Sequence, residues 1–290
     1  MSYKVTFIGL GVMGFPMAGY ISKAGYDVTV YNRTSAKANK WAEIYKGSTA
    51  STPAEASKDA DFIFTCVGND NDLKEVTIGS TGAFQNTKKG AVFIDNTTAS
   101  AKVARELFNI ATEKSFGFLD APVSGGQAGA ENGSLTVMVG GEQTDFDKAE
   151  PIISCYSKKI KLLGKSGSGQ LAKMVNQICI AGLVQGLSEG LRFGQNAGLN
   201  VEDVIDVISK GAAQSWQMDN RYKTMLEDKF DYGFAVDWMR KDLKIAMDES
   251  KTNGSKLPVT EIIDKFYEQI QNEGGNRLDT SSLIKLLPKK

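Results

Sequence analysis

A glycine-rich turn directly after the first strand constrains the fold of this chain more than any other feature. The apolar run Lys4 to Ile8 leads into a Gly-x-Gly-x-x-Gly turn that consists of Gly9, Leu10, Gly11, Val12, Met13 and Gly14. The first glycine permits a tight turn, the second lets a pyrophosphate approach the backbone, and the third lets the next helix pack close to the strand. The N-terminus of that helix then faces the phosphates. The sequence therefore predicts a dinucleotide-binding domain, rather than a glycine turn without a ligand.

Strands and helices alternate through the first half of the chain. We expect helices at 12–24, 35–45 and 99–114, and further strands at 27–31, 61–67, 91–94, 116–120 and 135–139. Apolar strands that alternate with helices are typical of a parallel sheet covered on both faces. This half is thus predicted to be an α/β Rossmann-type domain.

The pattern changes near Gly164, where the stretch GKSGSG has the composition of a linker. After Gln170 we expect no strand, but a long helix at 171–197 and further helices at 201–209, 237–251 and 258–272. The sequence therefore predicts a dinucleotide-binding domain at 1–164 and an all-α domain at 165–290.

The composition excludes several kinds of chemistry. The 290 residues include no histidine, so His-dependent nucleophiles, His acid–base catalysis and His metal sites are excluded. Proton transfer must then use Lys, Asp, Glu, Tyr or Cys. The 34 basic and 34 acidic side chains balance, which argues against a nucleic-acid or membrane-surface partner. The lysines at positions 158, 159, 161 and 165 are expected to be solvated surface.

Cysteine usage and apolar patterning bear on the compartment. Cys66, Cys155 and Cys179 are far apart and lack metal-ligand spacing, so we expect free, buried thiols in a reducing cytosol. The chain has no apolar stretch of about 18 residues, the length a transmembrane helix needs, and its first residues lack the features of a signal peptide. We therefore expect a cytoplasmic protein.

The end of the second strand bears on the choice of cofactor. NAD sites usually carry Asp or Glu there, whereas this chain has Asn32, Arg33 and Thr34. The planar guanidinium of Arg33 can pair with a 2′-phosphate, and its neighbours can add hydrogen bonds. These residues favour NADP. Alternatively, Arg33 faces solvent beside an unselective site, and NAD binds as well.

Polar and small residues also follow two later strands. Val67 and Gly68 follow one strand and Thr97 and Thr98 follow the next, in the position where the ribose and nicotinamide lie in such folds. Each is a candidate cofactor contact, although each is equally consistent with an ordinary turn.

Three segments are candidates for the chemical site. Ser124 offers a hydroxyl, and Gly125 and Gly126 expose backbone N–H groups that can bind a carboxylate; the alternative is a helix N-cap with flexible glycines. Lys173 and Asn176 share a helix face in an apolar turn, where burial would make the lysine a usable acid and base, unless it extends to solvent. Lys241 is a candidate cofactor contact or part of a surface ion pair.

These segments also carry a family resemblance. The motifs are FIGLGVMG at 7–14, DAPVSGG at 120–126, GQLAKMVNQ at 169–177, KDL at 241–243 and GNRLDTSS at 275–282. In this order and spacing the chain resembles the β-hydroxyacid dehydrogenases, in particular 3-hydroxyisobutyrate dehydrogenase and its relatives, nearly from end to end.

The resemblance implies more than the spacing does. It implies that Lys173 is the catalytic acid–base with Asn176 beside it, and that Lys241 lies at the cofactor. It implies that Ser124, Gly125 and Gly126 bind a small carboxylate-bearing substrate. A nicotinamide cofactor would exchange hydride with the substrate's carbinol carbon. The resemblance also implies a Rossmann-type domain joined by one long helix to a helical domain that pairs subunits into a homodimer or homotetramer.

Two departures and several competing functions accompany the resemblance. Tyr20 replaces a small polar residue of the family's first helix, which is expected to affect packing. The segment at 32–34 looks like that of the NADP-using glyoxylate and succinic semialdehyde reductases. A non-catalytic dinucleotide-binding scaffold and an imine-reducing enzyme compete with a dehydrogenase, but both tend to lack the lysine. A 6-phosphogluconate dehydrogenase would need a phosphate-binding set that we do not identify.

Overall fold

The central sheet of the first half has six parallel strands in the order β3-β2-β1-β4-β5-β6. They are β1 (Lys4–Ile8), β2 (Asp27–Tyr31), β3 (Ser48–Thr49), β4 (Phe62–Thr65), β5 (Val92–Asp95) and β6 (Gly117–Asp120). The strand order reverses between β1 and β4, and the carboxyl ends of strands at such a point bind ligands in doubly wound sheets. The predicted Rossmann-type fold is confirmed.

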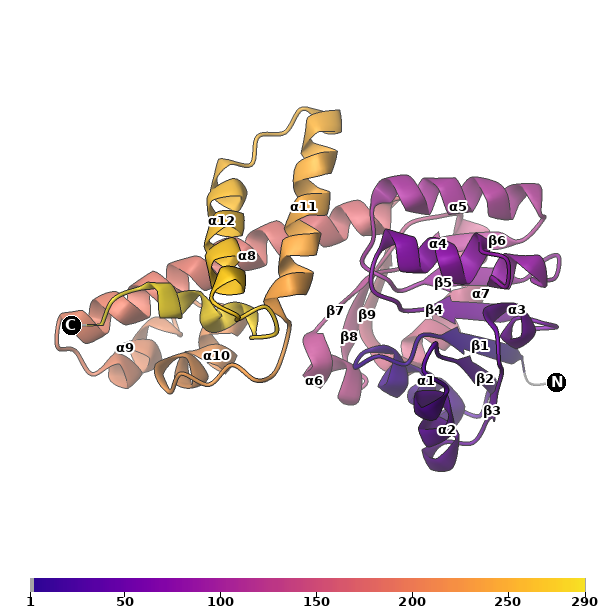
Figure 1. Cartoon of the computed structure of the whole chain (residues 1–290), viewed down its shortest axis with the longest axis horizontal. Coiled ribbons are helices and arrows are strands. Elements are labelled where there is room, and N and C mark those ends of the chain that lie inside the picture. Colours follow the sequence, from indigo (N-terminus) through magenta and orange to yellow (C-terminus); the bar gives the residue numbers. More distant parts are fainter. Residues whose placement is uncertain (1–2, 290) are drawn as a thin grey trace. The chain divides into compact units, whose positions relative to one another are not determined.

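The computed structural model describes residues 3–289, which form two compact units that divide between Lys173 and Met174 (Figure 1). Each unit has hydrophobic clusters of its own. The domain ranges 1–164 and 165–290 remain a prediction.

Helices cover both faces of the central sheet because side chains alternate along each strand. On one face, the rings of Phe7 and Phe64 stack at 5.9 Å in the cluster that includes Trp41. On the other, Phe93 and Phe118 stack at 5.7 Å. The helices of this unit are α1 (Gly14–Lys23), α2 (Ser35–Ile44), α3 (Pro53–Ala56), α4 (Asp70–Ile78), α5 (Ala101–Glu113), α6 (Gly126–Glu131) and α7 (Gln143–Ile153).

A second, three-stranded sheet was not expected. It contains β7 (Val123–Ser124), β8 (Leu135–Val139) and β9 (Ser157–Leu162), with β8 antiparallel to β7 and parallel to β9. The expectation that 135–139 closes the parallel series was therefore wrong. The connection at 125–134 is too short for the crossover that parallel strands require. The lysines of β9 are exposed, in agreement with their prediction as solvated surface.

The second unit is helical. Helix α8 (Ser168–Asn196) continues into it from the first unit, and it is followed by α9 (Val201–Ile208), α10 (Trp216–Leu226), α11 (Val236–Asn253), α12 (Pro258–Asn272) and the 3-10 segment η3 (Thr280–Leu286). Within residues 163–289 the only extended pairing is a single bridge between Ala235 and Asp279. The predicted long helix and the predicted helical second half are both confirmed.

Sequence patterns missed one helix of this unit and misplaced the start of another helix in the first unit. Helix α10 begins at the Ser215 cap, whose hydroxyl accepts the Met218 N–H at 3.1 Å, and it buries only Met218 and Met225. So few apolar positions give little helical periodicity. Helix α1 starts at Gly14 rather than at Val12, because the residues before Gly14 form the glycine-rich turn.

Thiols and membrane-spanning capacity were also predicted from the sequence. The three cysteines are free, but Cys66 and Cys155 are only partly buried and Cys179 is exposed, so the expectation of buried thiols was wrong. Cys179 lies on α8 between exposed Val175 and Leu183, one turn to either side. From residue 3 to 289, no helix has the length and apolar character that crossing a membrane requires.

Candidate functional site

The glycine-rich turn lies where β1 ends, and its backbone is fixed from both sides. Gly9 has φ 96°, and its N–H donates to the Tyr31 carbonyl at 2.9 Å. A Cβ on Gly14 would overlap the Gly9 carbonyl oxygen, whereas a Cβ on Gly11 would meet nothing. Leu10 is buried and Val12 is exposed. Gly9 and Gly14 are therefore required by the turn itself, and Gly11 leaves open backbone that suits a pyrophosphate.

The residues at the end of β2 have different roles in the structure. The Asn32 side chain accepts the Leu10 N–H at 2.9 Å and donates to the Thr34 carbonyl at 3.0 Å, so it joins the glycine turn to the loop before α2. The Arg33 side chain is 88% exposed, and its Nη1 lies 3.4 Å from Asp72 Oδ1. An exposed pair at this distance contributes little energy, so Arg33 is free to change partner.

The loops after β4 and β5 are joined in the same region. The Val67 N–H donates to Thr97 Oγ1 at 3.1 Å. Gly68 and Thr98 follow these residues and are partly buried. Because β4 and β5 are neighbours, the structure brings the two predicted cofactor loops together at one edge of the sheet.

Two carboxylates lie side by side beneath these loops. Asp95 and Asp120 are partners in the register of β5 and β6, and both are fully buried. Burial raises the pKa of Asp95 to about 7, although hydrogen bonds from Thr97 and Thr65 oppose the shift. Burial also raises the pKa of Asp120 to about 6, against hydrogen bonds from backbone N–H groups. Strand periodicity alone does not distinguish these acids from the apolar residues around them.

The predicted carboxylate-binding segment lies between β7 and β8. Gly125 has φ 136° and Gly126 has φ 61°, conformations that side chains rarely adopt, and both are exposed. Ser124 is the last residue of β7 and is partly buried. Helix α6, which begins at Gly126, has only 6 residues, so the site depends on the individual N–H groups more than on a helix dipole.

Lys173 lies one turn into α8 and is 7% exposed, so it does not extend to solvent. Asn176 follows on the same helix, and its amide donates to Gln177 Oε1 at 2.8 Å. The Gln177 amide in turn donates to Asp242 Oδ2 at 2.6 Å, and Lys241 Nζ lies 3.2 Å from Asp242 Oδ1. Asp242 and Gln177 are buried polar residues that sequence reasoning did not single out. Both lie inside the family motifs, which was the available signal.

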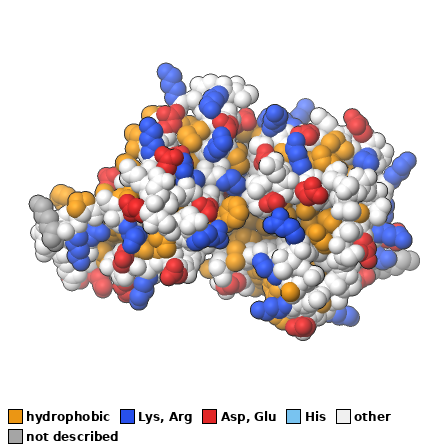
Figure 2. Space-filling model, viewed as in Figure 1, with side chains coloured by type: hydrophobic (Ala, Val, Ile, Leu, Met, Phe, Trp, Pro, Cys, Tyr) orange, Lys and Arg blue, Asp and Glu red, His pale blue; other side chains and the backbone are white. Residues whose placement is uncertain are grey.

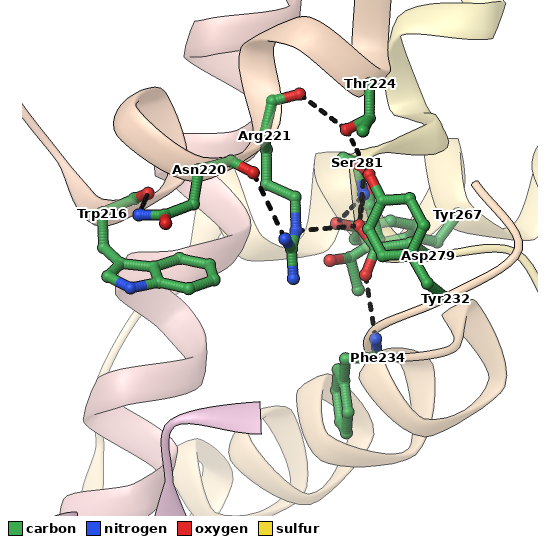
Figure 3. Close-up of polar contacts among 10 residues, drawn as sticks. Trp216, Asn220, Arg221, Thr224, Tyr232, Phe234, Tyr267, Asp279 and Ser281 are labelled. Carbon is green, nitrogen blue, oxygen red and sulfur yellow. Dashed lines mark hydrogen bonds and ion pairs between the residues drawn. The ribbon is translucent and has the colours of Figure 1, made fainter. Parts of the chain in front are cut away.

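The helical unit contains a second polar cluster, in which the partly exposed Arg221 lies next to the buried Asp279 (Figure 3). The guanidinium lies between the rings of Trp216 and Tyr232, at 4.8 and 4.9 Å from their centroids. Its Nε is 3.7 Å from Asp279 Oδ1, and the other Asp279 oxygen accepts the Phe234 N–H at 2.8 Å. Through Arg221 and Asp279 the structure thus links the segments around Trp216 and Phe234.

The visible surface shows no large region of one charge sign. Acidic and basic side chains are interspersed across the face seen in Figure 2, with apolar side chains between them.

Tyr20, the departure in the first helix, donates from its hydroxyl to the Glu131 carbonyl at 2.7 Å. Its role in this structure is therefore packing between α1 and α6.

Two protein-family models together match nearly the whole length of the chain. Residues 4–164 match the family model of the NAD binding domain of 6-phosphogluconate dehydrogenase. Residues 167–287 match the family model described as NAD-binding of NADP-dependent 3-hydroxyisobutyrate dehydrogenase.

Individual relatives agree with these family models. An uncharacterized oxidoreductase of Shewanella frigidimarina (strain NCIMB 400) is 61% identical over 99% of this chain and 98% of its own length. The probable 3-hydroxyisobutyrate dehydrogenase-like 1, mitochondrial, of Arabidopsis thaliana is 38% identical over 97% of this chain and 84% of its own length. A Mycobacterium tuberculosis 3-hydroxyisobutyrate dehydrogenase, solved with L-serine, is 27% identical with a TM-score of 0.88, and 99% of each chain is covered. These names do not favour a non-catalytic scaffold.

Proposed function

Because this chain belongs to the β-hydroxyacid dehydrogenase family and is an NAD(P)-dependent hydroxyacid dehydrogenase, we propose a specific site and reaction for it. The reaction interconverts a small β-hydroxy acid and its semialdehyde, with Lys173 as the acid–base. The burial of Lys173 on α8 carries this proposal, since the chain has no histidine for the same task.

The proposed mechanism assigns the proton to Lys173. When bound, the nicotinamide supplies or accepts the hydride. In oxidation, neutral Lys173 removes the proton of the substrate hydroxyl, and in reduction its ammonium form protonates the developing alkoxide. Asn176 orients Lys173 or the substrate oxygen. Because both directions use one group, the pH of the assay sets which direction is faster.

The substrate class follows from the segment at 124–126. The Ser124 hydroxyl and the exposed N–H groups of Gly125 and Gly126 would bind the substrate carboxylate and so fix the reacting carbon. Candidate substrates are 3-hydroxyisobutyrate, 3-hydroxypropionate, serine, tartronate semialdehyde, succinic semialdehyde and glyoxylate.

The cofactor is proposed to be NADP, with NAD as a weaker alternative. The turn at Gly9 to Gly14 would hold the pyrophosphate, and Arg33, with Asn32 and Thr34, would face the 2′-phosphate. Val67, Gly68, Thr98 and Lys241 would contact the ribose and nicotinamide. A preference for NADPH would favour a reductive role, as in the glyoxylate and succinic semialdehyde reductases.

The test of the catalytic assignment is Lys173→Ala, with Lys161→Ala on exposed β9 as its control. We expect kcat to fall at least about 100-fold with semialdehyde substrates, while the Kd for NADPH stays the same. The control should retain full activity. A Lys173→Ala enzyme with near wild-type kcat would refute the assignment.

The test of cofactor choice is Arg33→Ala, with Lys37→Ala on α2 as its control. The expected result is a rise of about 10-fold in the Kd for NADPH and no change for NADH. Equal effects on both cofactors would mean that Arg33 does not face the 2′-phosphate.

We also propose a cytoplasmic homodimer or homotetramer that assembles through the helical unit. On α8, added Cβ atoms at Gly182, Gly186 and Gly190 would meet nothing, and Phe193 on the same helix is 75% exposed. Small residues let a second helix approach closely. Sedimentation of a Gly186→Leu variant should show monomers, and an unchanged oligomer would refute this interface.

A further inference from the structure

The start of α8 is held by one buried side chain from the sheet. Asp120, the last residue of β6, accepts the Gly167 N–H on Oδ1 at 2.7 Å and the Gln170 N–H on Oδ2 at 2.9 Å. Gly167 directly precedes α8 and Gln170 lies in its first turn, where the N–H groups have no partner within the helix.

Glycine allows the helix and the strand to approach this closely. A Cβ on Gly169 would overlap the carbonyl oxygens of Asp120 and Met138, and a Cβ on Gly140 would lie 2.7 Å from Asp120 Oδ1. The distance between Asp120 and the first turn is therefore determined by backbone contacts on both sides.

A second side chain joins the same turn to the loop after β5. Gln170 is fully buried, its Oε1 accepts the Ala99 N–H at 3.0 Å, and its Nε2 donates to the Thr97 carbonyl at 2.7 Å. Thr97 also accepts the Val67 N–H through its hydroxyl. The first turn of α8 is thus tied to both predicted cofactor loops.

The charge on Asp120 favours this arrangement. Its pKa of about 6, raised by burial and opposed by the backbone N–H donors, leaves it ionised at neutral pH. A negative charge at a helix N-terminus interacts favourably with the helix dipole. Lys173 follows Gln170 by one turn, so the direction of the first turn determines where the lysine amine lies.

We propose that Asp120 and Gln170 are positioning residues that fix the first turn of α8, and with it Lys173, relative to the cofactor loops. This inference rests on the proposed role of Lys173. Neither residue exchanges a proton with substrate; both act through the position of the lysine.

The experiment compares Asp120→Asn, Gln170→Met, Lys173→Ala and the two double variants that contain Lys173→Ala. Asp120→Asn keeps the side-chain shape but turns one acceptor into a donor that faces an N–H group. Gln170→Met keeps the volume and loses both side-chain hydrogen bonds. Asp145→Asn is the control, because Asp145 is a partly buried carboxylate that packs against Gly117 at the opposite end of β6.

We expect Asp120→Asn to lower kcat by on the order of 10-fold to 100-fold, and Gln170→Met to lower it less. The Kd for NADPH should not change. The first-turn amides of α8 should exchange hydrogen faster in both variants, and Asp145→Asn should match wild type. In the Lys173→Ala background neither substitution should lower the residual rate further, because both act through the lysine.

Each contrary outcome overturns a defined part of the proposal. If Lys173→Ala is inactive and both positioning variants keep wild-type kcat, the inference fails and the catalytic assignment stands. If the losses add fully in the double variants, the two residues act on general stability and not through Lys173. If Lys173→Ala keeps its activity, the proposed function and the inference fail together. If Asp120→Asn does not fold, the same criteria apply to Gln170→Met.

Discussion

The two units each bury a carboxylate, Asp120 in the first and Asp279 in the second, but they stabilise it differently. Asp120 accepts two backbone N–H groups at the start of α8, those of Gly167 and Gln170, and takes part in no ion pair among the described residues. Asp279 accepts the backbone N–H groups of Phe234 and Ser281 and also has Arg221 at 3.7 Å.

The difference reflects what each architecture offers. A helix that starts at the end of a parallel sheet presents several unbonded N–H groups to one point. In the helical unit the N–H groups that reach Asp279 come from a loop and from the start of a short 3-10 segment, and the unit adds a cation held between two aromatic rings. The buried carboxylates Asp95 and Asp120 of the first unit, which take part in no ion pair among the described residues, are the ones whose pKa values approach neutrality.

The strongest test of this comparison adds a methyl group to Gly169, where the backbone of α8 lies directly against the strands that carry Asp120 and Met138. In Gly169→Ala the new Cβ overlaps two backbone carbonyl oxygens, which cannot move without displacing strands. We expect the free energy of unfolding in urea to fall by more than about 3 kcal/mol. Gly211→Ala in the helical unit, where the Cβ has only an ordinary contact, should change it by less than about 1 kcal/mol. Equal losses would show that Gly169 is not specially constrained.

The corresponding test in the helical unit removes the cation. Arg221→Met leaves Asp279 buried without a cation beside it. We expect the free energy of unfolding in urea to fall by between about 2 and 3 kcal/mol. Arg221→Lys should recover only part of it, because an ammonium group cannot stack between the rings. A Lys variant as stable as wild type would indicate that charge alone matters.

The smallest expected effect is a dependence of stability on pH that arises in the first unit. The pKa of Asp95 rises from 3.8 to about 7 on folding, so between these values the folded chain binds more protons than the unfolded chain, and stability falls as pH rises. Relative to the Asp95→Asn variant, the free energy of unfolding of the wild type should fall by about 2 kcal/mol between pH 5 and pH 8. Parallel stability curves for the two proteins would mean that Asp95 stays ionised throughout.

The fold was predictable where local patterns reflect tertiary packing. The glycine turn, the apolar strands and the long helix follow from residue periodicity and from the conformations open to glycine. The second sheet did not follow, because β9 consists of exposed lysines and partly buried residues and so lacks the apolar pattern of a buried strand. Helix α10 was missed because its stability comes from Ser215 and two methionines rather than from an apolar stripe.

The candidate site was predictable as a set of residues, but not as a network. Lys173, Ser124 and the glycines stand in recognisable motifs. The bonds from Asp120 to α8 join positions that are far apart in the sequence, and nothing in local spacing indicates them. The role of Asn32 was also unexpected, because the sequence suggested a cofactor contact and the structure shows a bond to the glycine turn.

That bond has a consequence for engineering. Asn32 accepts the Leu10 N–H, so its amide is part of the scaffold of the glycine-rich turn as well as a proposed contact of the cofactor. A designer who replaces the whole segment at 32–34 to exchange one dinucleotide for another would disturb both at once. Redesign that starts at Arg33 and keeps Asn32 separates the recognition of the adenosine end from the shape of the turn, and leaves a smaller library to screen.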